Sequence, residues 1–182
     1  MDTLFSNAPG FDQPLAVLKH CHDRIRKQLN TLDKLLQYLP VHGADKQAGQ
    51  AAKAVLRYFA VAAPLHHEDE EIDLLPTLEA TASGEDAVLL QQLLPRILLQ
   101  HHQMADQWAN LEQQLNAISD GASAHLSAQD VAQFNLIYTE HMHTEESQIA
   151  PMAKRIFSEA QMTQLGSAMQ LRRSISATTS IP

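Results

Sequence analysis

The sequence is poor in the features that several classes of protein require. Its single cysteine, Cys21, cannot form an internal disulfide, which excludes a disulfide-stapled scaffold and fits a reducing compartment. Only 6 glycines and 5% aromatic residues are too few for a typical β-sandwich or barrel. The most apolar stretch, Tyr58–Leu65, is far too short to span a bilayer.

Positive charge is also scarce, because 13 Lys and Arg face 21 Asp and Glu and leave a net charge of -8. Such a chain has no electrostatic reason to bind nucleic acid or an anionic membrane. Residues 1–11 contain neither the basic nor the long apolar region of a secretory signal. We therefore expect a cytoplasmic protein with no nucleic-acid and no membrane partner.

Helix-forming residues are abundant: Leu, Ala and Gln dominate, and 45% of the 182 residues are hydrophobic, enough for one domain with a buried core. Stretches rich in Pro, Gly and Ser predict three loops, at residues 40–45, 81–86 and 119–127. These loops separate four long segments, near residues 14–39, 46–80, 86–118 and 128–156. We predict an all-α fold, an antiparallel up-down four-helix bundle.

The ends of the chain complete this prediction. Residues 1–13 form an N-terminal extension, and the bundle domain covers residues 14–173. Ser158 with Gln161 has the capping pattern of a short fifth helix that would end near Arg173. The tail at residues 174–182 is expected to be disordered.

In each predicted helix, a residue of a metal-binding type interrupts the apolar seam. Apolar residues alternate at spacings of three and four in the first and third segments, and the seam positions left over are His22 and His101. In the second and fourth segments the seam holds one His/Glu pair each, and the two members of a pair are four residues apart. The pairs are His66 with Glu70 and His141 with Glu145. Residues four apart share one helix face, so each pair can reach one centre. Pro64 predicts a kink just before the first pair.

The two halves of the chain repeat each other. His66 and Glu70 recur 75 residues later as His141 and Glu145, and the prolines that follow, Pro76 and Pro151, keep the same offset. One His-x-x-x-Glu on a helix is most often a solvated face, and one seam histidine is most often a satisfied core residue. Two pairs and two single histidines in matching register favour a metal centre instead.

Imidazole and carboxylate together suit Fe, Mn or Zn, and a mixed site with open positions favours iron. Two buried carboxylates without a cation would be very costly. If Glu70 and Glu145 each bridge, the six residues hold two iron ions, with an oxo or hydroxo bridge and room for a small ligand.

Other residues near these positions have roles that the sequence leaves open. We interpret the remaining histidines as non-ligands, with His102 the least certain among them: His20, His42, His67, His102, His125 and His143. Glu71 and Glu146 follow the two seam glutamates, and either surface or site-supporting roles fit them. Tyr138, three residues before His141, is a weak catalytic candidate whose alternative is an ordinary core tyrosine, and Tyr58 is weaker still.

These residues resemble the hemerythrin HHE cation-binding family over about residues 14–156, including the stretch Cys21–Ile25. The family pattern, H…HxxxE…H…HxxxE with an acidic residue after each Glu and a later Pro, is specific. The resemblance implies a non-haem di-iron site that binds O₂, NO or peroxide. Oxygen-carrying members have a further histidine one turn after the third-helix ligand, where this chain has Ala105. That departure predicts a more open site that reacts with peroxide or NO, unless His102 substitutes.

The sequence leaves three alternative functions open. The first is binding or sensing of O₂, NO or peroxide in oxidative or nitrosative stress or iron handling. The second is a di-iron enzyme that decomposes peroxide as a catalase or peroxidase does. The third is a structural or zinc-loaded bundle without redox chemistry. The sequence specifies no protein redox partner.

Overall fold

The structure is a computed structural model that describes residues 8–179, and these residues form helices and no strand. The prediction of an all-α fold is confirmed. The elements in chain order are α1 (Pro14–His42), α2 (Lys46–Arg57), η1 (Tyr58–Ala62), α3 (Ala63–Glu68), η2 (Asp69–Leu74), α4 (Leu75–Thr81), α5 (Gly84–Ser119), α6 (Ala128–Thr144), η3 (Glu145–Ile149), α7 (Ala150–Ile156) and α8 (Glu159–Thr179). Within this range, no helix combines the length and apolar character needed to cross a membrane.

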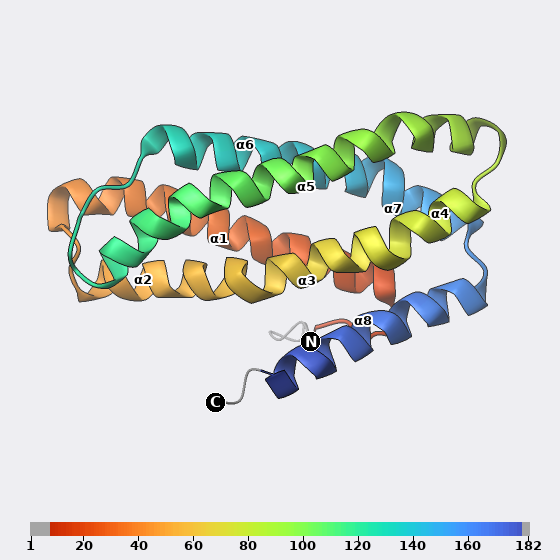
Figure 1. The fold of residues 1–182 in the computed structure, drawn as a ribbon, viewed down its shortest axis with the longest axis horizontal. Coiled ribbons are helices and arrows are strands. Elements are labelled where there is room, and N and C mark those ends of the chain that lie inside the picture. The colour runs from red at the N-terminus through yellow and green to blue at the C-terminus, as the bar shows by residue number, and fades with distance from the viewer. Residues whose placement is uncertain (1–7, 180–182) are drawn as a thin grey trace, which may run out of the picture.

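The long helical segments lie side by side, and α8 lies outside them (Figure 1). Elements α2 to α4, with η1 and η2 between them, run as one segment, and α6 to α7 as another. Helix α1 packs against α2 and α6, and α5 packs against the same two helices. Each segment therefore faces a common interior, which is where the polar seam residues lie.

Three π-helical turns interrupt these segments, and each ends just before a proline. The backbone N–H groups of Ala63, Leu75 and Ala150 donate to the carbonyls five residues earlier, those of Tyr58, Glu70 and Glu145. The next residues are Pro64, Pro76 and Pro151. Proline has no N–H and its ring crowds the carbonyl four residues back, so a widened turn relieves the clash without ending the helix. The distortion predicted at Pro64 therefore recurs at both seam glutamates.

The apolar core is divided into two clusters, and the polar seam residues lie between them. Ile25 and Met104 belong to one cluster, and Leu18 and Ile97 to the other. These four residues flank His22 and His101 in sequence. The polar layer is therefore enclosed by apolar packing from both directions along the helices.

The end of the first helix differs from the prediction. The loop expected from Pro40 begins later, because α1 continues to His42 and ends at Gly43, whose φ of 69° suits glycine. The cap predicted at Ser158 with Gln161 is confirmed, because their two hydrogen bonds form a capping box, and Ser127 caps α6 by accepting from Asp130 N–H.

Helix α8 is longer than expected, so the prediction of a disordered tail from Ser174 is wrong for residues 174–179. Its packing gives the reason: α8 contacts α1 and η2, and Arg173 bonds to the buried Asp69. At Gly166 a Cβ atom would lie 1.9 Å from the carbonyl oxygen of Phe11, so only glycine fits this close approach. Residues 180–182 of the expected tail, and 1–7 of the expected extension, lie outside the described part of the chain.

Candidate metal centre

All six residues predicted for the metal site are buried in one layer of the interior. Their exposed fractions are 2% for His22, 0% for His66, 1% for Glu70, 5% for His101, 1% for His141 and 4% for Glu145. They come from α1, α3, η2, α5, α6 and η3, so every long segment contributes. The structure thus brings together side chains from both halves of the duplicated chain, including His22 and Glu145 from its two ends.

Each glutamate lies between two histidines. One oxygen of Glu70 is 3.1 Å from Nε2 of His66, and its other oxygen is 3.3 Å from Nε2 of His101. Glu145 repeats this: its oxygens lie 3.1 Å from Nε2 of His22 and 3.3 Å from Nε2 of His141. Each carboxylate therefore has one oxygen beside each of two histidines, and these two histidines belong to different candidate metal sites.

The two candidate metal sites are overlapping sets of ligand atoms. In each set the atoms lie within 4.8 Å of one another, close enough for one metal ion. The His22 group comprises His22, His66, Glu70 and Glu145; the His101 group comprises His101, His141, Glu70 and Glu145. The two groups have both glutamates in common.

The polar atoms that face the interior fit cations. Nε2 of His22 and of His66, one oxygen of Glu70 and both oxygens of Glu145 are buried without a hydrogen-bond partner. Nε2 of His101 and Nε2 of His141 are 3.2 Å apart. Buried acceptors crowded in this way are costly when left alone, and metal ions would satisfy them.

Carboxylates and an amide outside the layer fix the orientation of three histidines. Nδ1–H of His101 donates to Glu71 at 2.6 Å, and Nδ1–H of His22 donates to Glu146 at 3.0 Å. Nδ1 of His141 lies 3.3 Å from the side-chain oxygen of Gln100. A ring that donates through Nδ1 keeps its Nε2 lone pair for a metal. Of the two roles left open for Glu71 and Glu146, the structure favours support of the site.

Burial and neighbouring charges set the protonation of the layer. Burial lowers the pKa of His141 to about 4 and holds the pKa of His66 well below its ordinary value. Burial and the charge of Glu145 raise the pKa of Glu70 well above its ordinary value. Burial alone would also raise the pKa of Glu145, but the imidazoles of His141 and His22 outweigh it and lower that pKa. The lowered pKa values keep the imidazoles of His66 and His141 neutral at physiological pH, as metal ligands must be.

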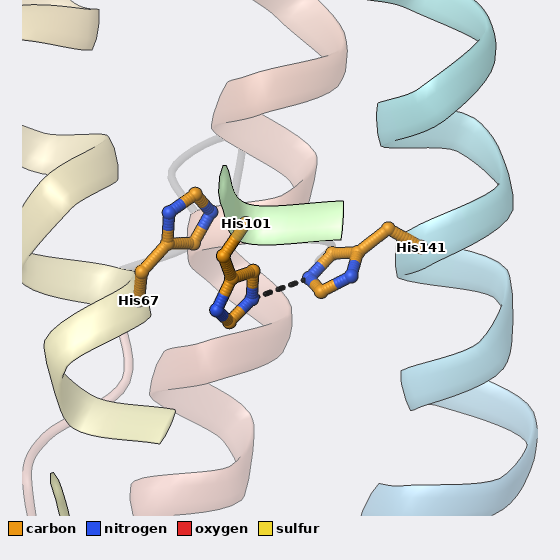
Figure 2. Close-up of side chains that lie close together, drawn as sticks. All are labelled: His67, His101 and His141. Atoms are coloured by element: carbon orange, nitrogen blue, oxygen red, sulfur yellow. Dashed lines mark hydrogen bonds between the residues drawn. The ribbon is translucent and has the colours of Figure 1, made fainter. Parts of the chain in front are cut away.

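His67 lies closer to the predicted ligands than the sequence analysis indicated. We interpreted it as a non-ligand, and its ring stacks on that of His101 with centroids 4.1 Å apart (Figure 2). Adjacent helical residues differ in direction by about 100°, so His66 and His67 cannot point the same way. The layer is wide enough that the two rings enter it from different directions, His66 beside His22 and His67 beside His101.

Two other candidates lie away from the ligand groups. His102 is exposed, and its Nδ1 bonds to the carbonyl oxygen of Leu98, as expected of a non-ligand. Tyr58 donates its hydroxyl to the carbonyl oxygen of Cys21 and so has a backbone partner. Tyr138 differs from these two. It is buried, with 3% of its surface exposed, it packs against Phe59 and Phe134, and it lines a cavity with His67 and His101.

A cavity reaches each ligand group from outside. One of about 380 Å³ adjoins the His101 group and is lined by His67, His101, Ala105, Trp108 and Tyr138, among others. The second, of about 330 Å³, adjoins the His22 group and is lined by His22, both seam glutamates and apolar residues such as Leu18 and Ile149. A small molecule therefore has an approach to either side of the layer.

An ion cluster beside the site was missed from the sequence. Asp69 precedes Glu70, is 0% exposed, and accepts hydrogen bonds from Arg172 and from Arg173, the latter at 2.6 Å. The two arginines anchor α8 over η2. A signal was present, because they are the only charged residues after position 159.

Comparisons with known proteins agree with the geometry. The sequence model of the Hemerythrin HHE cation binding domain matches residues 13–153. A protein of Haemophilus influenzae (strain ATCC 51907 / DSM 11121 / KW20 / Rd), described as "Uncharacterized protein", is 27% identical over 165 residues. The matched stretch covers 91% of this chain and 92% of that protein.

Proposed function

This chain belongs to the hemerythrin HHE cation-binding domain family, and we propose that it is a non-haem di-iron protein that binds or senses O₂, NO or peroxide. In this proposal His22 and His66 would hold one ion, and His101 and His141 would hold the other. Glu70 and Glu145 each have one oxygen near a histidine of either pair and would supply ligands to both ions. The finer arrangement, an antiparallel up-down four-helix bundle, belongs to the same proposal and is supported by the packing of α1 and α5 against the same two segments.

The observation that carries the proposal is the placement of the two carboxylates. Each glutamate has one oxygen near a histidine of the His22 group and the other near a histidine of the His101 group. A single zinc ion would need only four ligands in a tetrahedron and would leave the remaining histidines without a reason to converge. Two ions use all six residues.

Iron is favoured over zinc by the mixture of imidazole and carboxylate and by the free positions that it leaves. Two irons held here would supply a redox change and open positions for a small ligand. The protein supplies the rest: Glu71 and Glu146 orient His101 and His22, and the apolar walls of the two cavities admit a small molecule while limiting water.

The runner-up is a di-iron enzyme that converts two molecules of hydrogen peroxide into O₂ and two of water. Tyr138 is the observation that favours it, because this residue lines the cavity beside His101. Burial raises the pKa of Tyr138 far above its ordinary value, so its hydroxyl stays protonated and would be available to donate a hydrogen bond to peroxide in this cavity. A role in oxidative or nitrosative stress or in iron handling, in the cytoplasm, fits either function.

The test begins with the metal-free protein, reloaded with ferrous iron under anaerobic conditions. We expect elemental analysis to find two irons per chain, and Mössbauer spectra to show a coupled pair after oxidation. Absence of bound metal, or one zinc at a four-ligand site, would contradict the proposal. Optical spectra on addition of O₂, NO or hydrogen peroxide then separate the functions, and oxygen evolved from peroxide at a rate lowered in Tyr138→Phe would favour the enzyme.

A further inference from the structure

His67 lies close enough to His101 and His141, the two histidines of the His101 group, to share a metal ion with them. One ring nitrogen from each of His67, His101 and His141 falls in a set whose members are within 4.8 Å of one another. Figure 2 shows the three rings gathered from three different helices, with His67 on α3 facing the pair formed by His101 and His141. The rings of His67 and His101 are nearly parallel, at 13°.

The inner nitrogen of His67 has no partner among the described residues. Its Nε2 is buried, and no hydrogen bond reaches it. A buried nitrogen left without a partner is costly, so such groups normally find a donor, a water or a metal. The Nδ1 atoms of His101 and His141 contact Glu71 and Gln100, and their Nε2 atoms face each other at 3.2 Å, so a metal is the partner that all three rings could have in common.

The neighbouring helix leaves room for this ring. Ala105 stands one turn after His101 on α5, and it lines the same cavity as His67. A methyl group at position 105 does not reach the ligand layer, so the space beside His101 is filled from α3 instead. Sequence spacing along α5 alone could not reveal this, because the replacement comes from another segment.

We propose that His67 is a third imidazole ligand of the ion in the His101 group. This inference rests on the proposed two-ion site and adds a residue to it. The imidazoles then divide unequally, with His67, His101 and His141 on one ion and His22 with His66 on the other. The open position that Ala105 predicts is filled, and the ion beside His22 becomes the more open of the two, reached through the cavity lined by Leu18 and Ile149.

The experiment compares His67→Ala with His102→Ala, a matched histidine that is exposed and bonds to the carbonyl oxygen of Leu98. Metal-free protein is titrated with Co²⁺ under anaerobic conditions, and the visible d–d absorption reports each ion bound. We expect wild type and His102→Ala to bind two ions alike. His67→Ala should keep one affinity and lose at least about tenfold in the other, with a changed spectrum for the weakened ion.

The outcomes separate the two proposals. Two ions bound by His67→Ala with unchanged affinities and spectrum would overturn the role of His67 and leave the two-ion site standing. Fewer than two ions bound by wild type would overturn both. If His67→Ala does not fold, the Co²⁺-loaded wild type decides by NMR: a hyperfine-shifted ring N–H signal assigned to His67 supports the proposal, and an unshifted His67 ring overturns it.

Discussion

Glu71, in the first half of the duplicated chain, accepts a hydrogen bond at 2.6 Å from Nδ1 of His101, in the second half. The reverse contact also exists, because Glu146 of the second half accepts from His22 of the first at 3.0 Å. The duplication is therefore crossed: each half orients the single histidine of the other. Both contacts lie outside the ligand layer, where substitution can be tested without removing a ligand.

Loss of the Glu71 carboxylate should weaken metal binding without abolishing it. In Glu71→Ala, His101 loses the acceptor that fixes its ring, and we expect an affinity about 10–100-fold lower for one of the two ions. Competition with a coloured chelator measures this. Glu79→Ala, an exposed glutamate on α4, is the control and should bind as wild type does. Equal affinity in the two variants would contradict an orienting role.

Removal of a bridging glutamate should affect both ions. Glu145→Ala takes one oxygen from the His22 group and one from the His101 group, so elemental analysis should find most of both ions lost. Glu140→Ala, on the exposed side of α6 with a contact to Arg96 at 3.4 Å, is the matched control. A variant that keeps one ion at full affinity would show that Glu145 binds one ion and does not bridge.

Most of the site follows from sequence spacing, and the exceptions have physical causes. The inward positions of His22 and His101 could be predicted because a regular helix repeats its inward-facing positions every three or four residues. The 75-residue offset between the two halves predicted both His/Glu pairs. The reading failed for His67, whose contact with His101 depends on how far apart α3 and α5 lie. It also missed the π-turns, since a proline is expected to kink or end a helix.

The stability of the metal-free protein should depend on pH through His141. Its pKa falls from 6.5 to about 4 on folding, so between these pH values the imidazole is protonated in the unfolded state and neutral in the folded state. The contribution is present in full above pH 6.5 and is lost as pH falls toward 4, by up to about 3 kcal/mol. Glu70 acts in the opposite direction: its raised pKa favours folding at low pH and loses that effect as pH rises through it.

The comparison of wild type with His141→Gln isolates this contribution. Urea unfolding of both metal-free proteins, at pH values from 7.5 to 4, gives the difference in the free energy of unfolding. We expect the difference in the free energy of unfolding between wild type and His141→Gln to shrink as pH falls, because glutamine does not titrate. A difference that stays constant over this range would show that the His141 pKa is not depressed.

Helix α8 should stabilise the bundle through Asp69. With Arg172 and Arg173 both replaced by Ala, the fully buried carboxylate of Asp69 loses its cations, and we expect about 3–5 kcal/mol of destabilisation in urea unfolding. Arg155→Ala, which breaks an exposed pair with Asp86, should cost less than about 1 kcal/mol. Adding Asp69→Asn to the double variant should recover part of the loss, and no recovery would contradict the electrostatic cause.

Both ligand groups require Glu70 and Glu145, and this has a consequence for synthesis of the protein. Glu145 lies on η3, close to the end of the last long segment, so the growing chain has neither group complete until that residue has left the ribosome. The first half alone offers His22, His66 and Glu70, a site with one carboxylate too few. Metal capture would thereby wait until this segment has been made, and we expect a product truncated before Glu145 to bind the metal less tightly than a chain that includes it.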